Sequence, residues 1–266
     1  MKIIILANRD IASNLALNFL LPRISAHDIY VYLSSSVGGH NKRPRDLGNL
    51  RFFEQQLFND LLFPLLAKSG LSVDRQPLSF GGLGKLIGRQ ILPENAINSP
   101  DAIHRIRTID PDLIVSIRYG GILREELISI PKFGVINLHS GKLPQYRGVM
   151  ASFWAMLNGD SDLGTTLHFI VDSTIDTGAV ISRTAAPIAS DKSYLWNVLS
   201  LYPAGCGLII QTINAFEAGE EVVTEPPSEG GQYFSFPTDR ELKLFKSRGY
   251  QLYDTDEVLE IAKSYL

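Results

Sequence analysis

Residues 101–138 read DAIHRIRTIDPDLIVSIRYGGILREELISIPKFGVINL, and this stretch decides the fold. Asp101–Ile109 has apolar residues at helical spacing. Leu113–Ser116 and Gly134–Leu138 are short, β-branched apolar runs, with a helical stretch, Arg124–Ile128, between them. Continuous apolar runs of this length predict strands that are buried on both faces. Strands that alternate with helices predict a parallel sheet.

The same alternation extends to both sides of this stretch. We expect further strands at Ile3–Ala7, Ile29–Leu33, Thr165–Val171 and Ala179–Arg183, and further helices at Ala12–Leu21, Leu50–Ala67 and Ser193–Ala218. The sequence therefore predicts an α/β fold with a mainly parallel twisted sheet and helices on both faces.

Composition and charge suggest one large domain with a small appendage. The chain has 266 residues, of which 45% are hydrophobic and 20% charged, so it can bury a sizeable core. Residues 191–266 carry 6 Lys and Arg against 12 Asp and Glu, a net charge of −6 within a chain of net charge −3. We expect residues 1–190 to form the main domain and residues 191–266 a helical C-terminal extension. Whether that extension forms a homodimer contact or closes over a substrate stays open.

Several classes of protein are disfavoured. The single cysteine, Cys206, allows no intrachain disulfide and no cysteine metal cage, and the five histidines are scattered, so no metal is expected. The apolar run at the N-terminus ends at Ala7, too soon for a signal peptide, and no run reaches the ~18 apolar residues of a membrane span. The small net charge gives no reason to expect a nucleic acid or a membrane as partner. The default expectation is a cytoplasmic protein.

Reactive side chains follow two of the predicted strands. Asn137 and His139 are two apart near the end of one strand, so they point to the same side of the sheet. An amide can donate to a developing oxyanion, and an imidazole can pass protons. Thirty residues on, a turn carries Asp172 and Asp176. Locally, the first pattern also fits a strand end entering a Pro/Gly loop, and aspartates in turns usually brace the backbone. His168, within a strand, is more often a packed, hydrogen-bonded side chain.

The run from residue 137 to residue 178 resembles the folate-dependent formyltransferases, the family of glycinamide ribonucleotide transformylase and methionyl-tRNA formyltransferase. The matching residues, in order, are Asn137, His139, Leu143-Pro144, Tyr146-Arg147-Gly148, Asn158-Gly159-Asp160, Gly164-Thr165-Thr166 and Asp176-Thr177-Gly178. The resemblance spans roughly residues 1–190. It implies a Rossmann-like formyltransferase catalytic domain there.

The resemblance also implies roles for particular residues. Asn137, His139 and Asp176 match the catalytic trio of the family. Candidates for binding the folate are Arg118, Tyr119, Gly120, Gly121, Ile122, Leu123 and Asp172. Weaker candidates for binding the acceptor are Asn8, Arg9, Tyr146 and Arg147. The activity implied is a transferase reaction of one-carbon metabolism, in which 10-formyltetrahydrofolate donates its formyl group to an amine or hydroxylamine through a tetrahedral intermediate.

The acceptor stays open among several alternatives. The turn Ala7–Asn14 lacks the glycines with which glycinamide ribonucleotide transformylase holds phosphate, and the acidic C-terminal part is unsuited to gripping tRNA. The position of Asn137 leaves no room for the domain that precedes the catalytic one in formyltetrahydrofolate deformylase. A small biosynthetic metabolite, such as a nucleotide-linked amino sugar or hydroxyornithine, fits better. A non-catalytic binding or regulatory protein on the same scaffold is the alternative of another class.

Two further stretches could touch a substrate. Gly81–Gly88 looks like a phosphate loop but lacks a preceding buried strand and a downstream acid, so we interpret it as a flexible loop. Ser34–Leu47 is predicted to be a polar loop, and its cations Lys42, Arg43 and Arg45 would suit a diphosphate.

Overall fold

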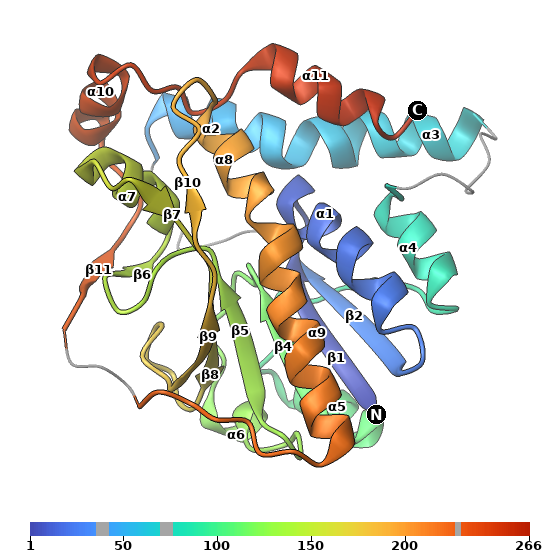
Figure 1. Cartoon of the computed structure of the whole chain (residues 1–266). Helices are drawn as coiled ribbons and strands as arrows, with labels where there is room; N and C mark the ends of the chain where they lie inside the picture. The colour runs from blue at the N-terminus through green and yellow to red at the C-terminus, as the bar shows by residue number, and fades with distance from the viewer. Residues whose placement is uncertain (36–42, 70–76, 227–229) are drawn as a thin grey trace.

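A seven-stranded sheet forms the centre of the molecule, with strand order β3-β2-β1-β4-β5-β8-β9 (Figure 1). The computed structural model describes residues 1–35, 43–69, 77–226 and 230–266. The strands of this sheet are β1 (Lys2–Asn8), β2 (Asp28–Ser34), β3 (Leu92–Pro93), β4 (Leu113–Ile117), β5 (Val135–His139), β8 (Thr166–Ile170) and β9 (Val180–Arg183). The first five are parallel, whereas β8 is antiparallel to both β5 and β9. The predicted α/β fold with a mainly parallel sheet is confirmed.

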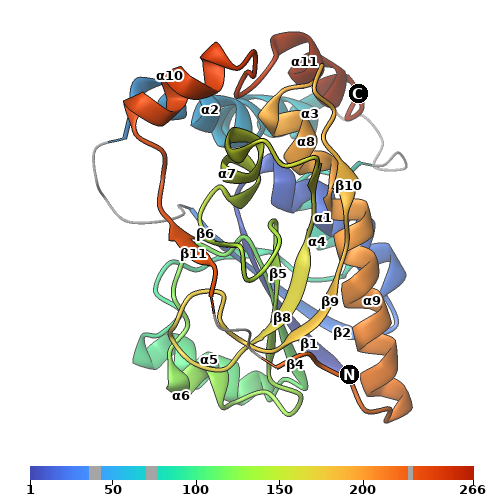
Figure 2. The same cartoon turned by 60° about the vertical axis from the view of Figure 1, so that its left-hand side comes forward.

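Helices cover both faces of the sheet (Figures 1 and 2). Helices α1 (Ile11–Leu20), α8 (Tyr194–Ser200) and α9 (Tyr202–Ala218) pack on one face, and α5 (Pro100–Ile109) and α6 (Glu125–Ile128) on the other. The sheet has a hydrophobic core on each face, and alternate residues of β1 belong to each, because successive strand residues point to opposite faces. Ile3 and Ile5 belong to one core, and Ile4 and Leu6 belong to the other. This burial on both faces explains the continuous apolar runs of the strands.

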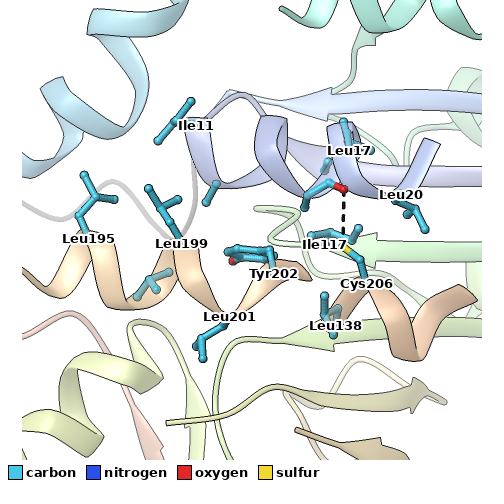
Figure 3. Close-up of a cluster of buried hydrophobic side chains, with 14 of the residues drawn as sticks. Ile11, Leu17, Leu20, Ile117, Leu138, Leu195, Leu199, Leu201, Tyr202 and Cys206 are labelled. Carbon is cyan, nitrogen blue, oxygen red and sulfur yellow. Dashed lines mark hydrogen bonds between the residues drawn. The ribbon is translucent and has the colours of Figure 1, made fainter. Parts of the chain in front are cut away.

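The larger core is closed by α9, which lies against α1 and the ends of β4 and β5 (Figure 3). Tyr202 and Cys206 of α9 are at most 1% exposed, and the Cys206 thiol donates to the carbonyl of Ala16 at 3.5 Å. Burial raises the pKa of Cys206 to about 12. Within the described residues, the stretch Tyr194–Ala218 is long and apolar enough to cross a membrane, yet 56% of its most apolar window is buried inside the fold. That burial is typical of a helix that covers a sheet.

A long helical rod lies above the carboxyl ends of the parallel strands. It consists of α2 (Arg45–Arg51), the π-helix η2 (Phe52–Leu62) and α3 (Phe63–Ser69), and it includes the predicted helix Leu50–Ala67. Helix α11 (Thr255–Lys263) runs alongside it (Figure 1). Phe53 of the rod packs on Tyr253, with ring centroids 4.4 Å apart.

Two sequence interpretations are wrong. The stretch Gly81–Gly88 is not a loop, because most of it belongs to helix α4 (Phe80–Leu86), which Ser79 caps by accepting from the Gly82 amide. A β-carbon on Gly84 would lie 3.0 Å from the Arg89 carbonyl, so this glycine serves close packing. Arg45, assigned to the basic loop, is the first residue of α2, while Lys42 lies outside the described residues.

Residues 191–266 are joined closely to the rest of the chain. Phe245 of α10 (Asp239–Ser247) and Val258 of α11 are buried in the same core cluster as β1 and α1. Strand β11 (Gln232–Phe234) pairs in parallel with β6 (Tyr146–Gly148), and β10 (Ala186–Pro187) pairs with β7 (Asp162–Leu163); none of these short strands was predicted. Helix α7 (Ala151–Asn158) and the 3-10 turn η1 (Leu21–Arg23) complete the described elements. The division of the chain at residue 190 stays a proposal.

Candidate active site

Strand β5 carries Asn137 and His139 to its carboxyl end. There the strand pairs with the antiparallel strand β8, and Asn137 lies directly opposite His168. The Asn137 side-chain amide lies 3.0 Å from His168 Nε2. Asn137 is partly exposed, whereas His168 is buried. The pairing register of β5 and β8 therefore brings an amide and an imidazole together from positions 31 residues apart.

The loop after β8 returns Asp176 to the same place. Asp176 has a left-handed backbone, with φ of 56°, which is uncommon for a residue other than glycine and is found preferentially at functional sites. Gly178 allows this turn, because a β-carbon there would lie 1.8 Å from the Phe169 carbonyl oxygen. The Gly148 amide donates to Asp176 Oδ2 at 2.8 Å. The backbone thus fixes the direction of the carboxylate from both sides.

The Asp176 carboxylate lies between two imidazole rings. Its Oδ2 is 3.5 Å from His139 Nδ1, and its Oδ1 is 3.4 Å from His168 Nε2. All three side chains are less than a tenth exposed. Burial alone would raise the pKa of Asp176, but the charge of His139, the hydrogen bond and charge of His168 and the Gly148 amide outweigh it and lower the pKa to about 2. Asp176 is therefore a carboxylate at every physiological pH.

Backbone carbonyls define where the imidazole protons lie. His139 Nε2 is 2.7 Å from the carbonyl of Tyr146, and His168 Nδ1 is 2.9 Å from the carbonyl of Phe169. Each of these nitrogens must carry hydrogen to donate to a carbonyl. The other nitrogen of each ring faces Asp176 and donates to it only when that ring is protonated. The site can therefore hold a proton between a fixed carboxylate and an imidazole, as proton transfer to or from a substrate requires.

Most of the candidate folate-binding residues lie in the turn after β4, and their contacts differ. The Arg118 guanidinium points into the protein, where it pairs with the carboxylates of Asp10 and Glu54. The Tyr119 hydroxyl donates to the Glu94 carbonyl at 2.9 Å, and the Gly120 amide donates to Ser34 Oγ at 3.0 Å. Gly121 packs against the Tyr119 ring, Leu123 is buried and Ile122 is exposed. Asp172 lies in the loop after β8, where it is exposed and accepts a hydrogen bond from the Thr174 amide.

The candidate acceptor-binding residues are mostly engaged within the fold. Asn8 is fully buried, donating to Asp10 and accepting from Ser34. Arg9 pairs with Asp60 at 3.2 Å on the surface of η2. The Tyr146 hydroxyl donates to Asp160 at 2.9 Å, and Arg147 Nε is buried without a hydrogen bond to any residue that the structure describes. Of Tyr146, only the backbone carbonyl contacts the site, through His139.

Sequence reasoning missed His168 and the contribution of the C-terminal part. His168 could have been found by pairing the two strands antiparallel and aligning Asn137 with it. The loop 144–149, which supplies the Tyr146 carbonyl and the Gly148 amide, is held by β11, where Val149 donates to the Phe234 carbonyl at 3.0 Å. No local signal predicts a pairing between segments about 85 residues apart.

A groove of about 810 Å³ runs between α4 and residues 88–93, and one end of it reaches the carboxyl ends of β1 and β2 at Arg9 and Ser35. Phe80, Ile91 and other apolar side chains form its walls, and the cations Arg9, Lys85 and Arg89 line it. Arg89 also pairs with Asp28 at 2.8 Å. In open parallel sheets, ligands bind outside the carboxyl ends of the strands, so the groove is placed where a ligand would be expected. Throughout the residues that the structure describes, no group of three or more His, Cys, Asp or Glu side chains is arranged to hold a metal ion.

The fold and this site define an α/β protein with an amide, two imidazoles and a carboxylate gathered around the carboxyl end of a central strand. Residues 80–195, which include all four of these side chains, match the family model described as "Formyl transferase". This segment, less than half of the chain, is therefore similar to the formyl transferase family, in line with the resemblance.

Curated relatives of similar sequence are methionyl-tRNA formyltransferases. The enzyme of Citrifermentans bemidjiense is 34% identical over 135 residues, which cover 51% of this chain and 42% of that protein. The enzyme of Fusobacterium nucleatum is 38% identical over 128 residues, covering 48% of this chain and 41% of that protein. The matches thus span about two fifths of the length of these relatives.

Solved structures share the fold over most of the chain. A sugar N-formyltransferase from Shewanella sp. superposes with a TM-score of 0.57 at 17% identity, covering 93% of this chain and 87% of that one. Glycinamide ribonucleotide transformylase 1 from Symbiobacterium toebii gives 0.57 at 15% identity, with coverages of 86% and 94%. The formyltransferase PseJ from Anoxybacillus kamchatkensis, solved with a UDP-linked formamido sugar and tetrahydrofolate, gives 0.52 at 14% identity, with coverages of 100% and 98%. At these identities the likeness shows the fold alone.

Proposed function

We propose that this protein is a folate-dependent N-formyltransferase that moves the formyl group of 10-formyltetrahydrofolate to the amine or hydroxylamine of a small biosynthetic metabolite. The observation that carries the proposal is the convergence of His139 and Asp176, with His168 joining Asn137 to them, within a segment that matches the formyl transferase family. A cytoplasmic location and a homodimer remain part of the proposal.

Each side chain of the site has a role in acyl transfer. Asn137, the partly exposed member, would donate its amide hydrogen to the negative charge that develops on the formyl oxygen. Asp176, ionised and fixed by the Gly148 amide, would keep His139 oriented and accept the proton that the attacking amine loses, directly or through His139. His168 would position the Asn137 amide from the opposite strand.

The surroundings of the site suit a folate. When bound, 10-formyltetrahydrofolate supplies an activated formyl group. The turn after β4 and the loop after β8 expose the apolar side chains Ile122, Val171 and Ile175, of which Val171 is 58% exposed. Apolar walls with a few polar groups are typical of pockets for flat heterocycles. The backbone of residues 118–123 and Asp172 would supply the polar contacts.

The groove beside α4 favours an acceptor that carries phosphate. Arg9, Lys85 and Arg89 line it. It adjoins β2, which is three strands from β5, so it lies roughly 14 Å across the sheet from the catalytic strand. An acceptor with its amine at Asp176 and a diphosphate in the groove would be an extended molecule, which favours a nucleotide-linked amino sugar over hydroxyornithine. PseJ, a fold neighbour, is itself solved with a UDP-linked formamido sugar.

Methionyl-tRNA is the second candidate acceptor, because the curated relatives of similar sequence are methionyl-tRNA formyltransferases. Binding of tRNA relies on several contacts from Lys and Arg to phosphate, and its affinity falls steeply with salt concentration. Residues 191–266 carry a net charge of −6, which opposes such a grip.

The test is a competition at matched salt among initiator methionyl-tRNA, a UDP-linked amino sugar, hydroxyornithine and glycinamide ribonucleotide, with 10-formyltetrahydrofolate as donor. We expect the highest kcat/KM for the amino sugar. Preferred formylation of the tRNA or of glycinamide ribonucleotide would show that the proposed acceptor, a small biosynthetic metabolite, is wrong. Binding of folate without transfer to any amine would support a non-catalytic protein on this scaffold.

A further inference from the structure

The turn 118–124, which carries most of the candidate folate-binding residues, lies beside the catalytic strand. It directly follows β4, which pairs with β5, and paired strands lie about 5 Å apart. Leu123 of the turn belongs to the hydrophobic core that α5 and α6 cover. Leu138 of β5 belongs to the core on the opposite face. Its neighbours Asn137 and His139 therefore point to the same face of the sheet as Leu123.

The side chain of Asn98 holds this turn through both ends of its amide group. Its Nδ2 donates to the Ile122 carbonyl at 2.8 Å, and its Oδ1 accepts from the Arg124 amide at 2.9 Å. Because a carbonyl only accepts and a backbone amide only donates, one orientation of the Asn98 amide satisfies both groups. A single side chain thus fixes the backbone on both sides of Leu123, where the chain forms neither helix nor strand.

The position of Asn98 is itself fixed by its neighbours in the chain. It lies between Ile97, which is 2% exposed in the core, and Ser99, whose side chain caps the N-terminus of α5. The segment that precedes it also contacts the turn, because the Glu94 carbonyl accepts from the Tyr119 hydroxyl at 2.9 Å. The turn is therefore attached at two points to the segment that leads into α5.

The turn keeps backbone donors that the fold does not use. Within the described residues, the amides of residues 121–123 form no hydrogen bond, whereas the Gly120 and Arg124 amides on either side donate to side chains. Backbone amides that the fold leaves unpaired bond to water or to a ligand. The Ile122 side chain, 54% exposed, adds an apolar surface beside them. The contacts of Asn98 thus order the turn without using the three donors within it.

We infer that Asn98 is a positioning residue for folate binding, which holds the turn 118–124 in the conformation that receives the folate. The folate would contact the turn and not Asn98 itself. A loop that is already ordered loses less conformational entropy on binding, so its affinity for the ligand is higher. The partners of Asn98 are backbone groups of the turn, so it acts on folate binding and not on the chemical step. This inference rests on the proposed function.

The test is the Kd of tetrahydrofolate, measured by calorimetry, for wild type, Asn98→Ala and Asn95→Ala. We expect Asn98→Ala to raise Kd about tenfold, since two hydrogen bonds that order the turn are lost. KM for 10-formyltetrahydrofolate should rise with it, while kcat and KM for the acceptor change little. Asn95→Ala is the matched control, because exposed Asn95 lies in the same segment but accepts from the Ser35 amide, at 2.8 Å. This control should leave Kd unchanged.

Asn98→Asp is a second variant, which should also weaken binding because an oxygen replaces the donor that faces the Ile122 carbonyl. An unchanged Kd in the Asn98 variants, or an equal rise in Asn98→Ala and Asn95→Ala, would overturn the inference even where wild type transfers the formyl group. If wild type binds tetrahydrofolate but formylates no amine, the proposed function fails, and the comparison of Kd values still decides the inference. A wild type that does not bind tetrahydrofolate would overturn both.

Discussion

Asp176 gathers the polar groups of the site, because its two oxygens face two imidazoles and a backbone amide holds it in place. Its partners come from the motif Asn137-x-His139 and from β8. The residue types of the motif and their order could be predicted from the sequence. His168 could not, because its contact with Asn137 depends on the antiparallel register of β8, and a histidine inside an apolar strand gives no sign of that register.

Asn137→Ala tests the oxyanion role. We expect kcat for formyl transfer to fall about 10²–10³-fold, the usual cost of removing one oxyanion donor. Binding of tetrahydrofolate, measured by calorimetry, should change little, because Asn137 would act mainly on charge that develops during the reaction. A near-normal kcat for this variant would show that Asn137 does not stabilise the oxyanion.

Gly178→Ala tests whether the turn that presents Asp176 needs glycine. The new methyl group would lie 1.8 Å from the Phe169 carbonyl oxygen, so the loop after β8 must shift. We expect a lower Tm together with a large loss of activity. Gly207→Ala is the matched control, because no atom lies within 4 Å of the new methyl group there. Alanine favours the helix by about 0.5–1 kcal/mol, so this control should raise Tm. Equal Tm values for the two variants would contradict the packing described for Gly178.

At the scale of elements, the longer strands and most helices followed from apolar patterning, but α4 and the short strands, β11 among them, did not. The glycines of α4 led to the prediction of a loop, although Ser79 caps the N-terminus of this helix. The π-helical form of η2 was not predicted, although the helix Leu50–Ala67 was, and β11 pairs with a strand about 85 residues away, β6, which no local pattern predicts. These elements surround the site, so the sequence predicted the scaffold better than the walls of the binding region.

Titration of Glu54, which belongs to η2, should make the free energy of unfolding depend on pH. Burial, the largest effect, and the charge of Asp10 raise the pKa of Glu54 to about 7 from 4.5, against the opposing charges of Arg118 and Arg43. Folded protein thus keeps a proton that unfolded protein loses, so the free energy of unfolding falls as pH rises from 4.5 to 7. The shift corresponds to about 3 kcal/mol.

Urea unfolding of wild type and Glu54→Gln at several pH values measures this effect. We expect the wild type to lose stability relative to the variant between about pH 4.5 and pH 7, because glutamine has no proton to lose. A difference between the two proteins that does not vary with pH would show that Glu54 titrates normally in the fold.

At the scale of the whole molecule, residues 191–266 complete both the core and the site. Helix α9 buries Cys206, Ile209 and Ile213 completely, and β11 supports the loop that contacts His139 and Asp176. We expect a fragment of residues 1–190 to lack cooperative unfolding and protected amides in hydrogen exchange, because one face of its sheet would be uncovered. A cooperatively folded fragment would instead establish residues 1–190 as an independent domain.

The most direct test of the central claim is the rate of formyl transfer from 10-formyltetrahydrofolate to the preferred amine in wild type and in Asp176→Ala. Calorimetry with tetrahydrofolate and Tm should be measured on both proteins. We predict turnover by the wild type and a loss of at least about 10²-fold in the variant, the scale of general acid–base catalysis, with folate bound about equally. A folded variant that transfers the formyl group at the wild-type rate would contradict the account.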